Sequence, residues 1–281
     1  MSHNENLFKG SIGRTYRESQ PWWPDELAAP KGAPNIVIIV LDDVGFADLG
    51  CYGSEIATPS MDRLASGGVR YSNFHVTSMC SPTRACLFTG RNAHAVGMGI
   101  IAEWSSGYPG YRGHVTAQAA TIPEVLRDHA YGTYAVGKWH LTNIAHYGAA
   151  GPQDNWPLGR GFGRWYGFHG ALTDQWNPEL YQDNRPIHLH PREAYHLSAD
   201  RVDHAIGDFV TIRPRRRTAR FCSISRLAHV TFPITCRASS SKNIVVVTIS
   251  AGMRCAPHAW RGNISLALSL PVPDWPHSTR E

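Results

Sequence analysis

Residues 36–41 form an unbroken aliphatic run, Ile-Val-Ile-Ile-Val-Leu. A strand with one solvated face alternates apolar and polar side chains, whereas an unbroken run suits a central parallel strand buried on both faces. Residue patterns predict further strands at 69–74 and 134–136, and helices at 58–67, 82–89 and 121–129. This alternation predicts an α/β fold, with a mostly parallel sheet and helices on both of its faces.

The composition narrows the class of protein. A length of 281 residues with 42% hydrophobic side chains is enough for a sizeable core. The six cysteines include no C-x-x-C pair, which argues against a zinc module and a disulfide scaffold. The N-terminus has no basic start followed by an apolar run, and no apolar stretch approaches the roughly 18 residues of a membrane span. These features predict a cytoplasmic protein with no membrane partner.

Three parts of the chain differ in character. Residues 1–34 are polar and rich in Trp and Pro, which indicates an N-terminal extension. Residues 35–209 carry the strand and helix patterns of a partial α/β domain. Residues 210–281 hold eleven Lys and Arg against two Asp and Glu, scattered among Ser and Pro without a period. Such a basic tail often contacts nucleic acid or a membrane surface.

Polar residues follow two of the expected strands. Asp42 and Asp43 come directly after the aliphatic run, where a hard divalent cation with oxygen ligands would relieve the repulsion between two carboxylates. A plain polar strand end fits the same pair. Lys138 and His140 project to the same side of an extended segment and suit an anionic group whose leaving oxygen needs a proton. A solvated Lys and a hydrogen-bonded core His fit them equally.

The run Cys80-Ser81-Pro82-Thr83-Arg84 opens an expected helix. Pro is suited to the first turn, because the backbone N–H that it lacks has no partner there. Cys80 would lie at the positive end of the helix, where an anion is stabilised, and Arg84 four residues later would share its face. The alternative is a small buried cysteine and a surface arginine.

These residues resemble the sulfatase family, whose signature opens C-x-P-[ST]-R. The resemblance continues after Arg84 through Leu87, Thr89, Gly90 and Arg91. Residues 35–45, 58–65 and 132–141 are similar, in the family's order, to its first strand and metal site, its TPNIDRLA segment and its second signature. The similarity covers residues 35–209 and is greatest to bacterial arylsulfatases. It implies the fold of the alkaline phosphatase superfamily.

The resemblance also implies a mechanism. A formylglycine-generating enzyme would oxidise Cys80 to an aldehyde, and one hydroxyl of its hydrate would attack the sulfur of a small-molecule sulfate ester. The second hydroxyl would then expel sulfate. Asp42, Asp43 and the position of Cys80 would ligate a divalent cation, calcium in most members. Arg84 would stabilise the hydrate, Lys138 would neutralise sulfate oxygens and His140 would orient or protonate.

The resemblance stops after Val210. The family's second half supplies an Asp-Asn metal pair, a His in an H-x-P-H segment and a further Lys, and residues 210–281 contain none of these motifs. The genetic code allows residues 241–256 to be encoded by codons that also carry a second reading. When each codon is read from the third base of the codon before it, these codons spell EKYRGRYDQRWDEMR. The same shift turns residues 221–241 into a string containing HVPHHVPREFI. Both strings are similar to what a sulfatase carries next, so we infer a frameshift between about Ala205 and Arg217.

A frameshifted tail would not be natively folded and would have no selected nucleic-acid partner. The chain is therefore expected to be a sulfatase by ancestry, with little or no activity as written. Two alternatives stay open: a phosphonate or phosphodiester hydrolase of the same superfamily, and a non-catalytic remnant.

Overall fold

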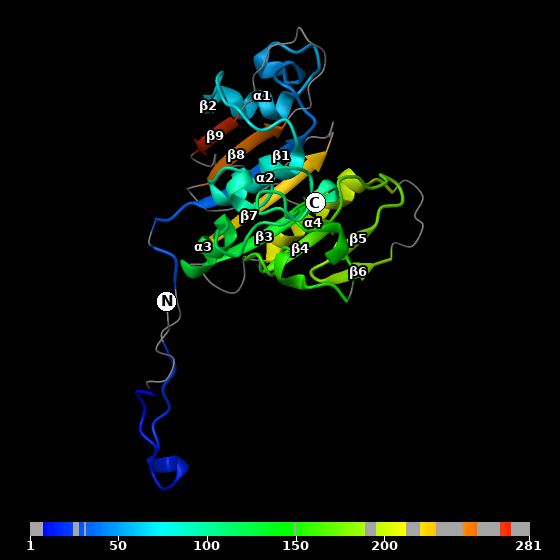
Figure 1. Ribbon diagram of the computed structural model, residues 1–281. Helices are drawn as coiled ribbons and strands as arrows, with labels where there is room; N and C mark the ends of the chain where they lie inside the picture. Colours follow the sequence, from blue (N-terminus) through cyan, green and yellow to red (C-terminus); the bar gives the residue numbers. More distant parts are fainter. Residues whose placement is uncertain are drawn as a thin grey trace.

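Figure 1 shows the protein as a computed structural model, with a nine-stranded sheet at its centre. The structure describes residues 8–24, 28–30, 32–148, 150–188, 195–211, 220–228, 244–251 and 265–270, and from residue 209 onward it describes the backbone alone. In that part of the chain, no helix is long and apolar enough to cross a membrane.

Four α-helices and nine strands make up the regular structure of the described residues. The helices are α1 (Pro59–Ser66), α2 (Cys80–Thr89), α3 (Ile122–Asp128) and α4 (Leu197–Thr211). The strands are β1 (Asn35–Asp42), β2 (Val69–Arg70), β3 (Tyr131–Lys138), β4 (Arg164–Phe168), β5 (Leu180–Gln182), β6 (Arg185–Ile187), β7 (Arg220–Ala228), β8 (Ile244–Ala251) and β9 (Ser265–Leu270).

The strand order in the sheet is β2-β9-β8-β1-β7-β3-β4-β5-β6. The five central strands, from β8 to β4, are parallel to one another, and the pairs β2–β9, β9–β8, β4–β5 and β5–β6 at the two margins are antiparallel. Strand β1 lies between β7 and β8, so the central position expected from its aliphatic run is confirmed. The α/β class is confirmed as well.

Helices cover both faces of the sheet. Ala135 of β3 packs in one apolar cluster with Phe88 of α2, and the next residue, Val136, packs in another with Leu197 of α4. Adjacent residues of a strand point to opposite faces. Helix α2 therefore lies on one side of the sheet and α4 on the other.

Helix ends follow the local sequence. Helix α2 ends at Gly90, whose φ of 64° lies in the left-handed region that glycine adopts without steric cost. It begins at Cys80, two residues earlier than expected from Pro82, and Met79 is its N-cap residue. Helix α3 begins with a capping box between Thr121 and Glu124. These ends place Cys80 in the first turn of α2.

Two expected strands differ in length. The strand expected at 69–74 is confined to Val69–Arg70, because both of its residues are exposed and no buried face extends it. The strand expected at 134–136 is longer, because β3 pairs with β4 on one side and with β7 on the other.

The two ends of the chain differ in their relation to the sheet. Residues 8–24 extend away from it (Figure 1), with a bridge between Ser11 and Gln20 and a short 3-10 turn at Tyr16–Glu18. The backbone of β7, β8 and β9 pairs within the sheet. This pairing does not test which reading frame supplies their residues, so the boundaries at 34 and 209 stay predictions.

Candidate active site

The carboxyl ends of β1 and β3 meet above β7. Asp42 ends β1, Lys138 ends β3, and the Lys138 Nζ lies 3.2 Å from Asp42 Oδ2. Because adjacent strands are about 4.8 Å apart, the two strands lie about 10 Å apart and the long Lys138 side chain spans the gap. Burial lowers the pKa of Lys138, and the facing Cys80 sulfur opposes that shift. Lys138 thus brings a cation to the sheet edge where α/β proteins bind ligands.

Cys80, His140 and Glu103 form a continuous chain of contacts. The Cys80 Sγ lies 3.2 Å from Nδ1 of His140, and Nε2 of the same ring lies 2.6 Å from Oε2 of Glu103. His140 is fully buried and Cys80 is half-buried. Burial raises the pKa of the Cys80 thiol, but His140 and Lys138 outweigh burial and lower it to about 7. A nucleophile beside a base held by a third group is the arrangement that activates side chains in many enzymes.

Arg84 ties helix α2 to the end of β3. Its Nε donates to the Trp139 carbonyl at 2.7 Å and its Nη2 donates to the Lys138 carbonyl. Nη1 is buried and has no hydrogen-bond partner among the described residues. Burial lowers the pKa of Arg84 to about 10, so the guanidinium stays charged at neutral pH. An unpartnered N–H on a buried cation leaves this site suited to an anionic ligand.

His140 is held in a strained backbone conformation. Its φ is 58°, in the left-handed region that residues other than glycine rarely adopt. The Ser81 Oγ donates to the His140 carbonyl at 2.8 Å, and the His140 N–H donates to the His169 carbonyl at 2.9 Å. Strain of this kind persists where surrounding contacts fix it, and it is frequent at functional sites.

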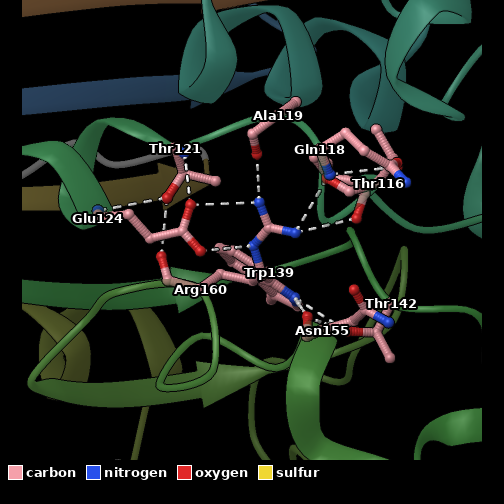
Figure 2. A network of polar contacts seen from close by, with 10 residues as sticks. Thr116, Gln118, Ala119, Thr121, Glu124, Trp139, Thr142, Asn155 and Arg160 are labelled. Atoms are coloured by element: carbon pink, nitrogen blue, oxygen red, sulfur yellow. Dashed lines mark hydrogen bonds and ion pairs between the residues drawn. The ribbon is translucent and has the colours of Figure 1, made fainter. Parts of the chain in front are cut away.

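A buried arginine supports the loops behind the site. Figure 2 shows Arg160 inserted between two loops. It donates to the carbonyls of Val115, Thr116 and Ala119 at 3.0, 3.3 and 2.6 Å, and its Nε lies 3.1 Å from Glu124 Oε1. In the same view the Trp139 Nε1 donates to the Asn155 carbonyl at 2.9 Å. These bonds fix the segment that carries Lys138 and His140.

The structure gathers most of the residues expected from the sequence. Cys80, Arg84, Lys138, His140 and Asp42 are linked by direct contacts or through the carbonyls at the end of β3. Asp43 is exposed, with a φ of 55°, and it acts on this cluster through its charge, which raises the pKa of Lys138.

Sequence reasoning missed Glu103 and Ser81. Ser81 directly follows Cys80 in the motif, and this adjacency to Cys80 was the sequence feature that could have indicated its role. Glu103 lies in a short 3-10 turn, Ala102–Trp104, that no pattern singles out.

The donor atoms at this site are of the type that a divalent cation prefers, but they are too few to hold one. Asp42 and Asp43 supply carboxylate oxygens, which calcium prefers, and Cys80 supplies sulfur until it is converted. Calcium takes six to eight oxygens, and no group of three or more His, Cys, Asp or Glu in the described residues could hold a metal ion. One carboxylate oxygen of Asp42 already faces Lys138. The described residues therefore form only part of a cation site.

The lowered pKa of Cys80 has a measurable consequence. In protein made without a formylglycine-generating enzyme, position 80 keeps its thiol, and a pKa of about 7 leaves about half of it as thiolate at neutral pH. Alkylation by iodoacetamide is expected to be half-maximal near pH 7 at Cys80. Burial raises the pKa of Cys51 and of Cys86, so both should react only at higher pH. Peptide masses across a pH series give all three profiles at once, and coincident profiles would contradict the expectation.

The Sulfatase family model matches residues 34–249. The chain belongs to the sulfatase family. The match begins where the N-terminal extension was expected to end and runs beyond residue 209 into β8.

Sulfatases of several organisms are similar to about half of this chain. An arylsulfatase of Klebsiella aerogenes is 34% identical over 155 residues, which are 54% of this chain and 32% of the relative. Human arylsulfatase A is 41% identical over 139 residues, 48% of this chain and 25% of the relative. An uncharacterized sulfatase of Schizosaccharomyces pombe is 42% identical over 137 residues, 46% of this chain and 23% of the relative. The matches therefore span about a quarter to a third of these relatives.

Two solved structures share the fold. The crystal structure of Ps i-CgsB has a TM-score of 0.65 at 20% identity, over 85% of this chain and 66% of that chain. BT4656, solved in complex with its substrate D-glucosamine-2-N,6-O-disulfate, has a TM-score of 0.53 at 27% identity, over 70% and 35%. Together with the family match, these likenesses establish that the chain has the sulfatase fold.

Proposed function

We propose that the site descends from an arylsulfatase-type hydrolase of small-molecule sulfate esters and keeps the half that holds the nucleophile. The observation that carries this proposal is the position of Cys80, in the first turn of α2 and 3.2 Å from Nδ1 of His140. The buried cations Lys138 and Arg84 adjoin it. A nucleophile enclosed by cations suits attack on a group with several anionic oxygens.

Each side chain has a role in this proposal. Lys138 neutralises sulfate oxygens, and its ion pair with Asp42 keeps it directed over the end of the sheet. Arg84 offers its unpartnered Nη1 to the charge that develops beside position 80. His140 takes a proton from the side chain at position 80 or orients that side chain, because its Nδ1 faces the sulfur.

Two groups come from outside the chain in this proposal. Formylglycine at position 80, made by a formylglycine-generating enzyme, supplies a hydrated aldehyde whose hydroxyl is the nucleophile. A divalent cation, calcium in most of the family, supplies positive charge beside that hydroxyl. Asp42 and Asp43 are the residues that would hold it, together with position 80 and with ligands absent from residues 210–281. A cytoplasmic location stays a prediction.

The chain as written is proposed to have lost turnover through a frameshift between about Ala205 and Arg217. The Asp-Asn pair, the H-x-P-H histidine and the second Lys of the family have no counterpart in residues 210–281. Residues 35–209 then form a partial catalytic domain, preceded by the extension 1–34.

The test uses a frame-restored protein, in which one base inserted before codon 217 returns the downstream sequence to the family's frame. Expressed with a formylglycine-generating enzyme, it should carry formylglycine in the Cys80 peptide by mass analysis and should hydrolyse an aryl sulfate. A preference for an aryl phosphonate would identify the phosphonate hydrolase of the same superfamily instead. An unmodified Cys80 without calcium binding would identify a non-catalytic remnant.

A further inference from the structure

We infer that Glu103 is a positioning residue, which fixes the His140 ring in the tautomer that presents an unprotonated Nδ1 to the side chain at position 80. The tautomer follows from the geometry alone. Its role in catalysis rests on the sulfate ester hydrolysis proposed above.

This inference rests on a short contact between Glu103 and His140, in which other hydrogen bonds hold both residues in place. Glu103 Oε2 lies 2.6 Å from His140 Nε2, and Glu103 Oε1 accepts from the Ala171 N–H at 3.1 Å. The 3-10 turn that carries Glu103 is itself fixed to helix α2, because the Ala102 N–H donates to Ser81 Oγ at 3.3 Å. Ser81 also donates to the His140 carbonyl. Glu103 is therefore fixed relative to the histidine that it contacts.

The chemistry of a carboxylate decides which ring nitrogen carries hydrogen. An ionised carboxylate only accepts hydrogen bonds, so the nitrogen that faces it must be the donor. Burial raises the pKa of Glu103, but the interactions with His140 and the backbone hydrogen bonds that Glu103 accepts together outweigh burial and lower it, so the group is ionised at neutral pH. Neutral imidazole has a single N–H, which Glu103 draws to Nε2. The lone pair of Nδ1 is then free to face Cys80.

The relay moves one proton and leaves the rest in place. The group at position 80 gives its proton to Nδ1, while the Nε2–H stays in its hydrogen bond with Glu103. The carboxylate then stabilises the imidazolium without accepting a proton. A carboxylate acts on a catalytic histidine in this way in serine proteases, where replacing it by the amide leaves the wrong tautomer.

The plainer alternative is that Glu103 only ties its loop to Ala171. The Glu103→Gln variant separates the two roles. Its amide oxygen still accepts from the Ala171 N–H, so the tie survives. Its NH₂ group donates to His140 Nε2, so the single ring hydrogen must lie on Nδ1. Nδ1 is then a donor and can no longer accept a proton from position 80. Glu179→Gln is the matched control, because Glu179 is exposed and its removal changes the charge by the same amount.

The first test reads the tautomer directly. Nitrogen-15 spectra of the full chain with labelled histidine are recorded in a Cys80→Ser background, which holds no thiolate to keep a proton on Nδ1. His140, assigned by loss of its signals in His140→Gln, should show a protonated Nε2 and an unprotonated Nδ1. In the same background Glu103→Gln should reverse the assignment and Glu179→Gln should leave it unchanged. A protonated Nδ1 in the Cys80→Ser protein, or no reversal in folded Glu103→Gln, would overturn the inference.

The second test measures the consequence at position 80. With the unconverted thiol, alkylation of Cys80 at neutral pH should slow about tenfold in Glu103→Gln, relative to Cys86 in the same digest. In the frame-restored, converted protein, kcat for an aryl sulfate should fall about 10²-fold or more with KM little changed. An equal fall in Glu179→Gln would count against the inference. An inactive protein that still shows the Nε2–H tautomer would refute the proposed function alone.

Discussion

Restoring the reading frame between codons 205 and 217 is expected to raise aryl sulfate hydrolysis by about 10³-fold or more over the 281-residue chain, given the acceleration that a complete hydrolase site provides. The reason is the composition of the site. Arg84, Lys138 and His140 surround the nucleophile at position 80, but the described residues supply too few oxygens for a cation. Both proteins, expressed with a formylglycine-generating enzyme, would be compared by release of a coloured phenol.

The control is Cys80→Ala in the frame-restored protein, which removes the nucleophile and should return hydrolysis to background. Clear turnover by the purified, intact 281-residue protein would contradict the expectation. So would resequenced DNA that keeps the present frame, together with a close relative that shares residues 210–281.

Replacing Arg160 by Met is expected to lower the free energy of unfolding by about 3–5 kcal/mol, a large share of the roughly 5–15 kcal/mol that stabilises a domain. Arg160 is 4% exposed, and its guanidinium is the donor to the carbonyls of Val115, Thr116 and Ala119. Without it, buried carbonyls lose a donor and Glu124 loses its cation. Urea denaturation followed by tryptophan fluorescence measures the loss.

The matched control is Arg164→Met, only four residues further along. Like Arg160, Arg164 pairs with a carboxylate, here that of Asp183 at 3.0 Å, but the Arg164 side chain is 52% exposed. Exposed ion pairs contribute about 0–1 kcal/mol, so this variant should unfold at nearly the same urea concentration as the unsubstituted protein. Similar losses in the two variants would show that burial is not what makes Arg160 important.

The central strand and the nucleophile site could be predicted from local sequence. The unbroken run before Asp42 admits only a strand buried on both faces, and the Cys80 motif combines a helix start with an arginine one turn later. Parallel strands share one carboxyl edge, so the residues at the ends of two such strands lie at the same edge of the sheet. Asp42 and Lys138 do meet, at 3.2 Å.

The contacts that assemble the site could not be predicted in the same way. Glu103 meets His140 only because a short turn folds back over α2, and no periodicity records that approach. The insertion of β7 between β1 and β3 was equally hidden, since strand order depends on packing between segments far apart in sequence. The antiparallel margins depend on such long-range pairing as well.

The position of β7 has a consequence for the order of assembly. The ion pair between Asp42 and Lys138 bridges two strands whose common neighbour comes from residues 220–228, which leave the ribosome after both of them. Until that segment is synthesised, β1 and β3 have no partner between them, and each keeps a row of unsatisfied backbone groups on that side. The segment that supplies residues 220–228 therefore decides whether the two halves of the sheet join.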